Sequence, residues 1–110
     1  MDRDRLYLGH VLSAIADIED FASEGRAAFM QDRKTQSAVI RQLEVLGEAV
    51  KQMSEPVRKA HPEVPWRLIA GARDRLIHGY FQVDLDSVWT MVADDLPVLK
   101  GQIQAILREG

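Results

Sequence analysis

The stretch that decides the fold runs from residue 84 to residue 106 and reads DLDSVWTMVADDLPVLKGQIQAI. Its apolar residues recur at alternating steps of four and three, at Leu85, Trp89, Val92, Leu96, Leu99, Ile103 and Ile106. This spacing places them along one face of an α-helix. Asp84 or Asp86 would cap its N-terminus. Because Pro97 cannot donate a hydrogen bond to the carbonyl of Ala93, we expect a kink there rather than a helix end.

The same spacing predicts two earlier long helices. The first covers about residues 3–24, and its apolar stripe consists of Leu8, Val11, Ile15, Ile18 and Ala22. Gly25 follows it as a helix stop. After a loop, Asp32 is a candidate N-cap of the second helix. The stripe of this second helix consists of Val39, Leu43, Leu46, Val50 and Met53.

Shorter helices are expected between these long ones. Ser54 would cap a helix that runs to about His61, and Pro65 would open another that continues to Tyr80. Alternating β-branched runs and hairpin turns are nearly absent. The sequence therefore predicts an all-α, up-and-down bundle of four to five helices in a single domain, residues 1–110. Stripes of this kind also suit pairing between subunits, so we expect a homodimer.

Composition narrows the function. The chain has 110 residues, 46% of them hydrophobic, and no cysteine, which excludes disulfides and thiolate metal sites. The histidines at 10, 61 and 78 lack a metal-ligand spacing, so no metal or other cofactor is expected. With no secretory signal and no apolar run approaching about 20 residues, the expected location is the cytoplasm, away from the membrane.

Charge is unevenly distributed along the chain. The formal net charge is −3, yet residues 58–80 hold five basic and only two acidic side chains. These are Arg58, Lys59, Arg67, Arg73 and Arg75 against Glu63 and Asp74. A local basic segment of this kind can attract a polyanion although the whole chain is acidic.

Residues 73–80, RDRLIHGY, bring a cation, an imidazole and a phenol together within this basic segment. Arg73 offers a planar donor fork that suits phosphate, and His78 is a residue type that accepts and donates protons near neutral pH. RNA carries its own nucleophile, the 2′-hydroxyl, so its cleavage needs only a base, an acid and positive charge. Asp74, four residues before His78, could orient the imidazole.

Helix geometry alone does not join these groups. Positions five apart lie about 140° apart around a regular helix, so Arg73 and His78 do not share a face, whereas Arg73 and Tyr80 do. A two-fold dimer would place two copies of each residue across one cleft, where one histidine serves as base and the other as acid. The alternative is structural: a histidine at a helix end often caps it, and nearby arginines are often surface charges.

Other notable side chains are interpreted as structural. His10 and His61 are expected to have no chemical role, and His61 comes just before a proline in a helix-ending turn. Trp66 and Trp89 fall on apolar stripes and are expected in the core or at a subunit interface rather than as platforms for base stacking.

A family resemblance adds to this interpretation. Arg73, His78 and Tyr80 form the pattern R-x4-H-x-Y, and with the helical framework the chain resembles HEPN-domain ribonuclease toxins of the HepT type. Further matching segments occur in the same order, namely residues 42–49 (QLEVLGEA), 65–66 (PW), 83–84 (VD) and 95–97 (DLP). Asp74 stands where the family often has asparagine.

The resemblance implies an all-α dimer that acts as the toxin of a toxin–antitoxin pair, type II or type VII-like. It implies metal-independent RNA cleavage by Arg73 and His78 in a shared cleft. It also implies an MNT-type nucleotidyltransferase antitoxin as partner, which transfers AMP from ATP to Tyr80 and forms a larger hetero-oligomer with the toxin. An added anionic phosphate would occupy the charge that the RNA backbone needs.

Two alternatives remain open at this stage. The chain could be a non-catalytic dimeric module that binds a nucleotidyltransferase partner through Tyr80 or the basic segment. It could also be a purely structural helical dimer. RNA cleavage separates the first interpretation from both alternatives, and complex formation separates the two alternatives from each other.

Overall fold

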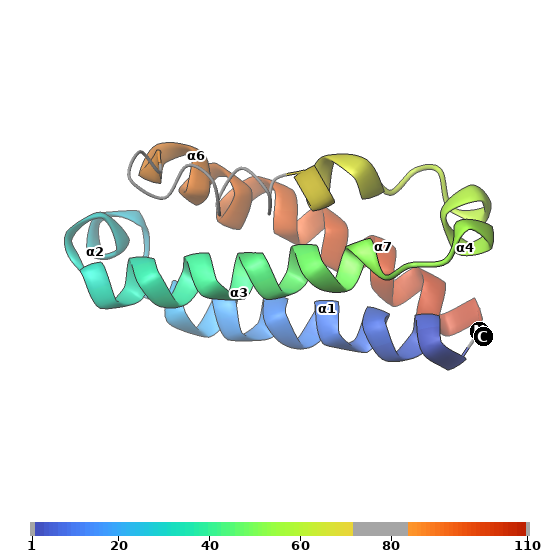
Figure 1. Ribbon diagram of the computed structural model, residues 1–110. Coiled ribbons are helices and arrows are strands. Elements are labelled where there is room, and N and C mark those ends of the chain that lie inside the picture. Colours follow the sequence, from blue (N-terminus) through green and yellow to red (C-terminus); the bar gives the residue numbers. More distant parts are fainter. Residues whose placement is uncertain (1, 72–83, 110) are drawn as a thin grey trace.

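The computed structural model describes residues 2–71 and 84–109, and in these residues the chain is all-α (Figure 1). The helices are α1 (Asp2–Phe21), α2 (Arg26–Gln31), α3 (Arg33–Lys51), α4 (Glu55–Ala60), α6 (Leu85–Thr90) and α7 (Leu96–Glu109). A π-helical segment, η2 (Met91–Asp95), joins α6 to α7, and residues 66–71 are also helical. No strand occurs among the described residues, which confirms the all-α prediction.

The expected number of four to five helices is wrong. Six α-helices lie entirely within the described residues. The expected loop before Asp32 contains α2, whose sequence RAAFMQ consists of helix-favouring residues except for Phe29, and Phe29 is fully buried. The π-helical segment η2 further divides the C-terminal helix into α6 and α7.

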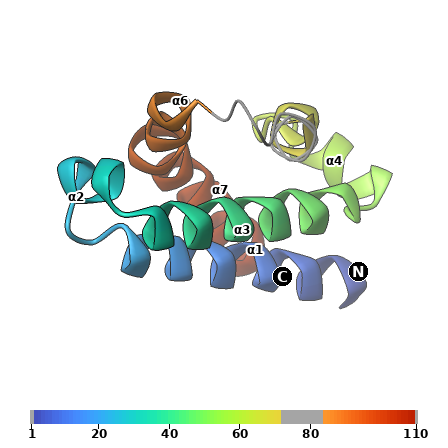
Figure 2. The ribbon, with the colours of Figure 1, turned by 60° about the vertical axis from the view of Figure 1, so that its left-hand side comes forward.

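The first two long helices form an antiparallel pair (Figures 1 and 2). Both predicted stripes are buried, with Leu8, Val11, Ile15 and Ile18 on α1 facing Val39, Leu43, Leu46 and Val50 on α3. Gly25 allows the turn from α1 into α2, because its φ of 94° is a conformation that side chains with a Cβ disfavour. Asp32 caps α3 as expected, its carboxylate accepting from the backbone N–H of Lys34 at 3.0 Å.

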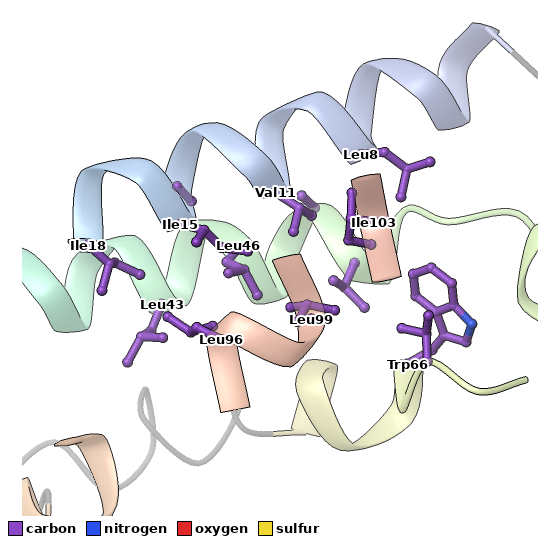
Figure 3. Close-up of a cluster of buried hydrophobic side chains, with 14 of the residues drawn as sticks. Leu8, Val11, Ile15, Ile18, Leu43, Leu46, Trp66, Leu96, Leu99 and Ile103 are labelled. Atoms are coloured by element: carbon purple, nitrogen blue, oxygen red, sulfur yellow. The ribbon is translucent and has the colours of Figure 1, made fainter. Parts of the chain in front are cut away.

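The helix α7 runs back past this pair and completes the core (Figure 3). Its buried residues Leu96, Leu99 and Ile103 pack against the stripes of α1 and α3, and Trp66 lies at the edge of the same cluster. The helix α7 runs parallel to α3 and antiparallel to α1 (Figure 1). The helical residues 66–71 run against both α3 and α7, so α1, α3, this segment and α7 alternate in direction, as an up-and-down bundle requires. None of the helices in the described ranges is long and apolar enough to cross a membrane.

The C-terminal helix differs from the prediction at its start. The helix continues through Pro97, and the irregularity is the π turn η2, where the N–H of Leu96 bonds to the carbonyl of Met91. A π turn contains one more residue than an α turn. In a regular helix, residues seven positions apart lie on the same face. Because of the extra residue in the π turn, Val88 and Leu96 lie on the same face although they are eight positions apart. Val88 is 1% exposed, whereas Leu85 and Trp89 of the predicted stripe are half-buried.

Candidate functional site

The predicted site residues Arg73, Asp74, His78 and Tyr80 lie outside the described residues. Their proposed roles therefore remain predictions. The structure does describe the residues that come immediately before and after this segment. Residues 66–71 lead into it, and Asp84 opens the helix that follows it. These flanking residues fix the two ends of the segment that carries the predicted site.

Trp66 anchors the segment that precedes the predicted site. Its indole Nε1 donates a hydrogen bond to the carbonyl of His61 at 3.0 Å, and its ring is buried. The backbone N–H of Ile69 bonds to the carbonyl of Pro65 at 3.0 Å, which starts the helix at this proline as predicted. A buried tryptophan with its N–H satisfied is a rigid anchor and does not stack on bases. Its predicted place in the core is confirmed.

His61 fastens the same turn to the C-terminal end of α7. Its Nδ1 lies 3.4 Å from a carboxylate oxygen of Glu63, and its Nε2 lies 3.3 Å from one of Glu109. The imidazole is mostly buried, with 16% of its side chain exposed. These contacts are in keeping with the structural role expected for His61.

The short helix α4 is fixed at both ends. Ser54 caps its N-terminus, as predicted, and is itself held by the carboxylate of Asp4. Arg58 in α4 donates to the carbonyls of Val50 and Met53, at 3.2 and 3.3 Å, and so satisfies the C-terminal end of α3.

Asp4 is the residue that the sequence analysis missed. It is 5% exposed, and both of its carboxylate oxygens are used by Ser54. A signal was present, because Asp4 lies four residues before Leu8 and so extends the apolar stripe of α1 by one step. A carboxylate at an apolar-stripe position indicates a buried polar partner.

The chain leaves the predicted site through Asp84, the N-cap of α6. Its carboxylate accepts from the Ser87 hydroxyl at 2.9 Å and from the backbone N–H groups of Asp86 and Ser87. The Ser87 hydroxyl, followed by these backbone donors, lowers the pKa of Asp84 from its ordinary value of 3.8. Asp86 in turn forms an ion pair with Arg26 of α2.

Two grooves border residues 65–68, and Pro65 and Leu68 line both. The first, here the apolar groove, has a volume of about 380 Å³ and lies between α3, α7 and residues 65–69. Its apolar lining includes Leu46, Ile69, Leu99 and the strongly exposed side chains of Leu68 and Val98. Its charged residues are Glu63 and Asp95, both acidic.

The second groove, here the basic groove, is wider, at about 710 Å³. It lies between α4 and the start of the helical residues 66–71. Three cations line it, Arg58, Lys59 and Arg67, against the single carboxylate of Glu55. The two grooves therefore offer opposite chemistry on the two sides of one short segment.

Across the described ranges, no three His, Asp or Glu side chains come together as metal ligands would. The structure thus defines a class of protein: a small all-helical domain in which anchored chain segments precede and follow an arginine- and histidine-bearing motif. The family model described as "Ribonuclease HepT-like" matches residues 11–106. The chain belongs to the HepT-like ribonuclease family.

Relatives support the same assignment over nearly the full length. A protein from Thermococcus cleftensis named "Probable ribonuclease HepT" is 46% identical over 101 residues, covering 91% of this chain and 92% of the relative. A Methanocaldococcus jannaschii protein named "Putative RNase MJ0127" is 40% identical, covering 96% of this chain and 88% of the relative. No solved structure matches the chain significantly.

Proposed function

We propose that this chain is a metal-independent endoribonuclease, the toxin of a toxin–antitoxin pair of type II or a type VII-like system, and that Arg73 and His78 carry its chemistry. The observation that supports this most is the R-x4-H-x-Y segment in a chain that matches a ribonuclease family over residues 11–106. Arginine and histidine are the two residue types that cleavage through the 2′-hydroxyl needs.

The proposed reaction needs no group beyond the protein and the RNA. One His78 takes the proton of the 2′-hydroxyl, and the 2′-oxygen attacks the adjacent phosphorus. The bond from phosphorus to the 5′-oxygen breaks, and that oxygen takes a proton from the His78 of a second copy. Arg73 balances the charge that builds up on the phosphate oxygens. The products are a 2′,3′-cyclic phosphate and a 5′-hydroxyl, and Asp74 supports the imidazole.

The second copy is part of the proposal, because one histidine cannot be base and acid in the same step. Leu68 and Val98, 63% and 62% exposed, lie in the apolar groove next to the segment that leads into the motif. Exposed apolar side chains in a shared hollow favour burial against another protein surface. We propose a homodimer that forms through this apolar groove and places the two motifs across one cleft.

Control of the enzyme follows from the same site. An MNT-type nucleotidyltransferase antitoxin would transfer AMP from ATP to Tyr80 and bind the toxin in a larger hetero-oligomer. The added phosphate would compete with the RNA backbone for Arg73 and His78. Inhibition then results from occupied positive charge.

The test is RNA cleavage in the presence of a metal chelator. The wild-type protein is expected to cut and to leave 2′,3′-cyclic phosphate ends, and His78→Ala or Arg73→Ala is expected to lower kcat by about 10²–10⁴-fold. His10→Ala is the matched control, because His10 is an exposed histidine on α1 whose ring contacts only Tyr7 among the aromatic residues described. Unchanged cleavage by both motif variants would remove the site assignment. A folded dimer that binds the nucleotidyltransferase but cuts no RNA would establish the non-catalytic alternative.

A further inference from the structure

The basic groove is the strongest feature of the described surface that the proposed reaction does not use. Its cations are poorly neutralised. Within the described ranges, Arg58 bonds to backbone carbonyls alone and Arg67 makes no ion pair. Lys59 lies 3.5 Å from Glu55, but both side chains are 77% exposed, and such a pair contributes little because water screens it. The groove therefore keeps a net positive charge open to solvent.

The residues that line this groove come shortly before the motif in the sequence. Arg67 lies six residues before Arg73 in the sequence. Six residues span at most about 20 Å even when fully extended, so the two arginine backbones are within that distance whatever the conformation between them. A nucleic-acid strand whose scissile phosphate is at Arg73 would reach the groove within a few nucleotides.

The other groove does not offer the same path. Glu63 and Asp95 are the charged residues of the apolar groove, and their carboxylates repel a phosphate backbone. The basic groove presents guanidinium and ammonium donors instead, which bind phosphates through charge and hydrogen bonds. Charge complementarity thus assigns the polyanion to one side of residues 65–68.

We infer that the basic groove, through Lys59, Arg67 and the charge of Arg58, binds the phosphate backbone of the RNA strand that flanks the cleaved linkage. This inference rests on the proposed ribonuclease function and deepens it. Trp66 forms part of the groove, but its ring is buried and its N–H is used, so the groove lacks an aromatic platform among its described residues. Binding there depends on charge and shows no preference between bases.

The test measures binding separately from cleavage. A fluorescein-labelled oligouridylate of twenty nucleotides is titrated with His78→Ala protein, which holds RNA without cutting it, and anisotropy is followed over a range of salt concentrations. Adding Lys59→Ala and Arg67→Ala is expected to raise Kd about 5–20-fold at low salt. The slope of log Kd against log salt concentration should fall by about 1.4, because two phosphate contacts are lost and each contributes roughly 0.7. Lys59→Arg with Arg67→Lys, which keeps both charges, should restore the affinity.

Arg41→Ala is the matched control. Arg41 is also an exposed cation with a nearby glutamate, 3.6 Å from Glu44, but it lines a different hollow together with Tyr7 and His10. Its removal should leave Kd close to that of the parent protein. Equal Kd values and salt slopes for Arg41→Ala and the double alanine variant would overturn the inference, as would a lack of oligouridylate binding altogether.

A cleavage assay on protein with an intact His78 separates the groove assignment from the nuclease proposal. If RNA is cut and the double alanine variant binds normally, the groove assignment fails and the nuclease proposal stands. If groove-dependent binding is found but no RNA is cut, the nuclease proposal fails and the RNA-binding surface stands.

Discussion

The carboxylate of Asp4 in α1 binds Ser54, the N-cap residue of α4, at two points: Oδ1 accepts from the backbone N–H of Ser54, and Oδ2 from its hydroxyl, both at 2.8 Å. The same hydroxyl accepts from the N–H of Val57 in the first turn of α4. Fifty positions of sequence separate the two residues. The contact fixes α4, which forms one side of the basic groove, to the first turn of the protein.

Asp4→Ala should therefore be one of the costly single changes in α1. It leaves the N–H and hydroxyl of Ser54, which are partly buried, without their charged partner, so we expect a loss of about 1.5–3 kcal/mol in the free energy of unfolding. Urea denaturation measures this loss. Asp17→Ala, at an exposed position of the same helix, should change the value by less than about 0.5 kcal/mol. Equal losses for the two variants would show that the Asp4–Ser54 contact contributes nothing.

The cap at Asp84 should make the helix after the motif sensitive to acid. Its pKa is lowered by folding, chiefly through the Ser87 hydroxyl, so its stabilising effect is complete above the unfolded value of 3.8 and is lost as the pH falls through the folded value. Thermal melts of wild-type and Asp84→Asn protein should differ in Tm at pH 6, and the difference should shrink below about pH 4. Ser87→Ala should reduce this pH dependence. A Tm difference that stays constant down to pH 2.5 would contradict it.

The apolar groove should control the oligomeric state. A charge at Leu68 or Val98 would have to be buried without a partner in the proposed dimer, so Leu68→Asp and Val98→Asp should each give a monomer that no longer cuts RNA. Light scattering after gel filtration measures the mass. Leu6→Asp is the control, because Leu6 is 57% exposed on α1 outside this groove. If both groove variants remain dimeric, the dimer interface does not lie in the apolar groove.

Tyr80 should be the residue that receives AMP. The chain has two tyrosines, at positions 7 and 80, so Tyr7 serves as the control for Tyr80. When the toxin is incubated with ATP and its nucleotidyltransferase, intact-mass spectrometry should show one added AMP on the wild type and on Tyr7→Phe, and none on Tyr80→Phe. Tyr80→Phe should keep its ribonuclease activity, since the phenol is no part of the proposed reaction. An adenylylated Tyr80→Phe protein would exclude this control mechanism.

Sequence periodicity predicted the long helices well because burial on α1 and α3 follows a regular helical repeat. Leu8 to Ile18 and Val39 to Val50 face the core as the spacing requires. The predicted stripe of the C-terminal helix is wrong at Val88, because a π turn shifts the apolar repeat by one residue. No local sequence pattern predicts this turn. Asp4 was missed because its partner lies fifty positions away. The roles of Arg73, Asp74, His78 and Tyr80 come from residue chemistry and family resemblance, and they stay predictions.

The π turn at Met91–Asp95 also affects how relatives of this chain should be compared. Losing one residue from this turn would restore a regular α-helix and leave the residue equivalent to Val88 seven positions before the one equivalent to Leu96, so both would still face the core. A homologue one residue shorter in this interval is therefore expected to bury the same two apolar residues, and a gap in an alignment here marks the loss of the π turn and leaves the buried face unchanged.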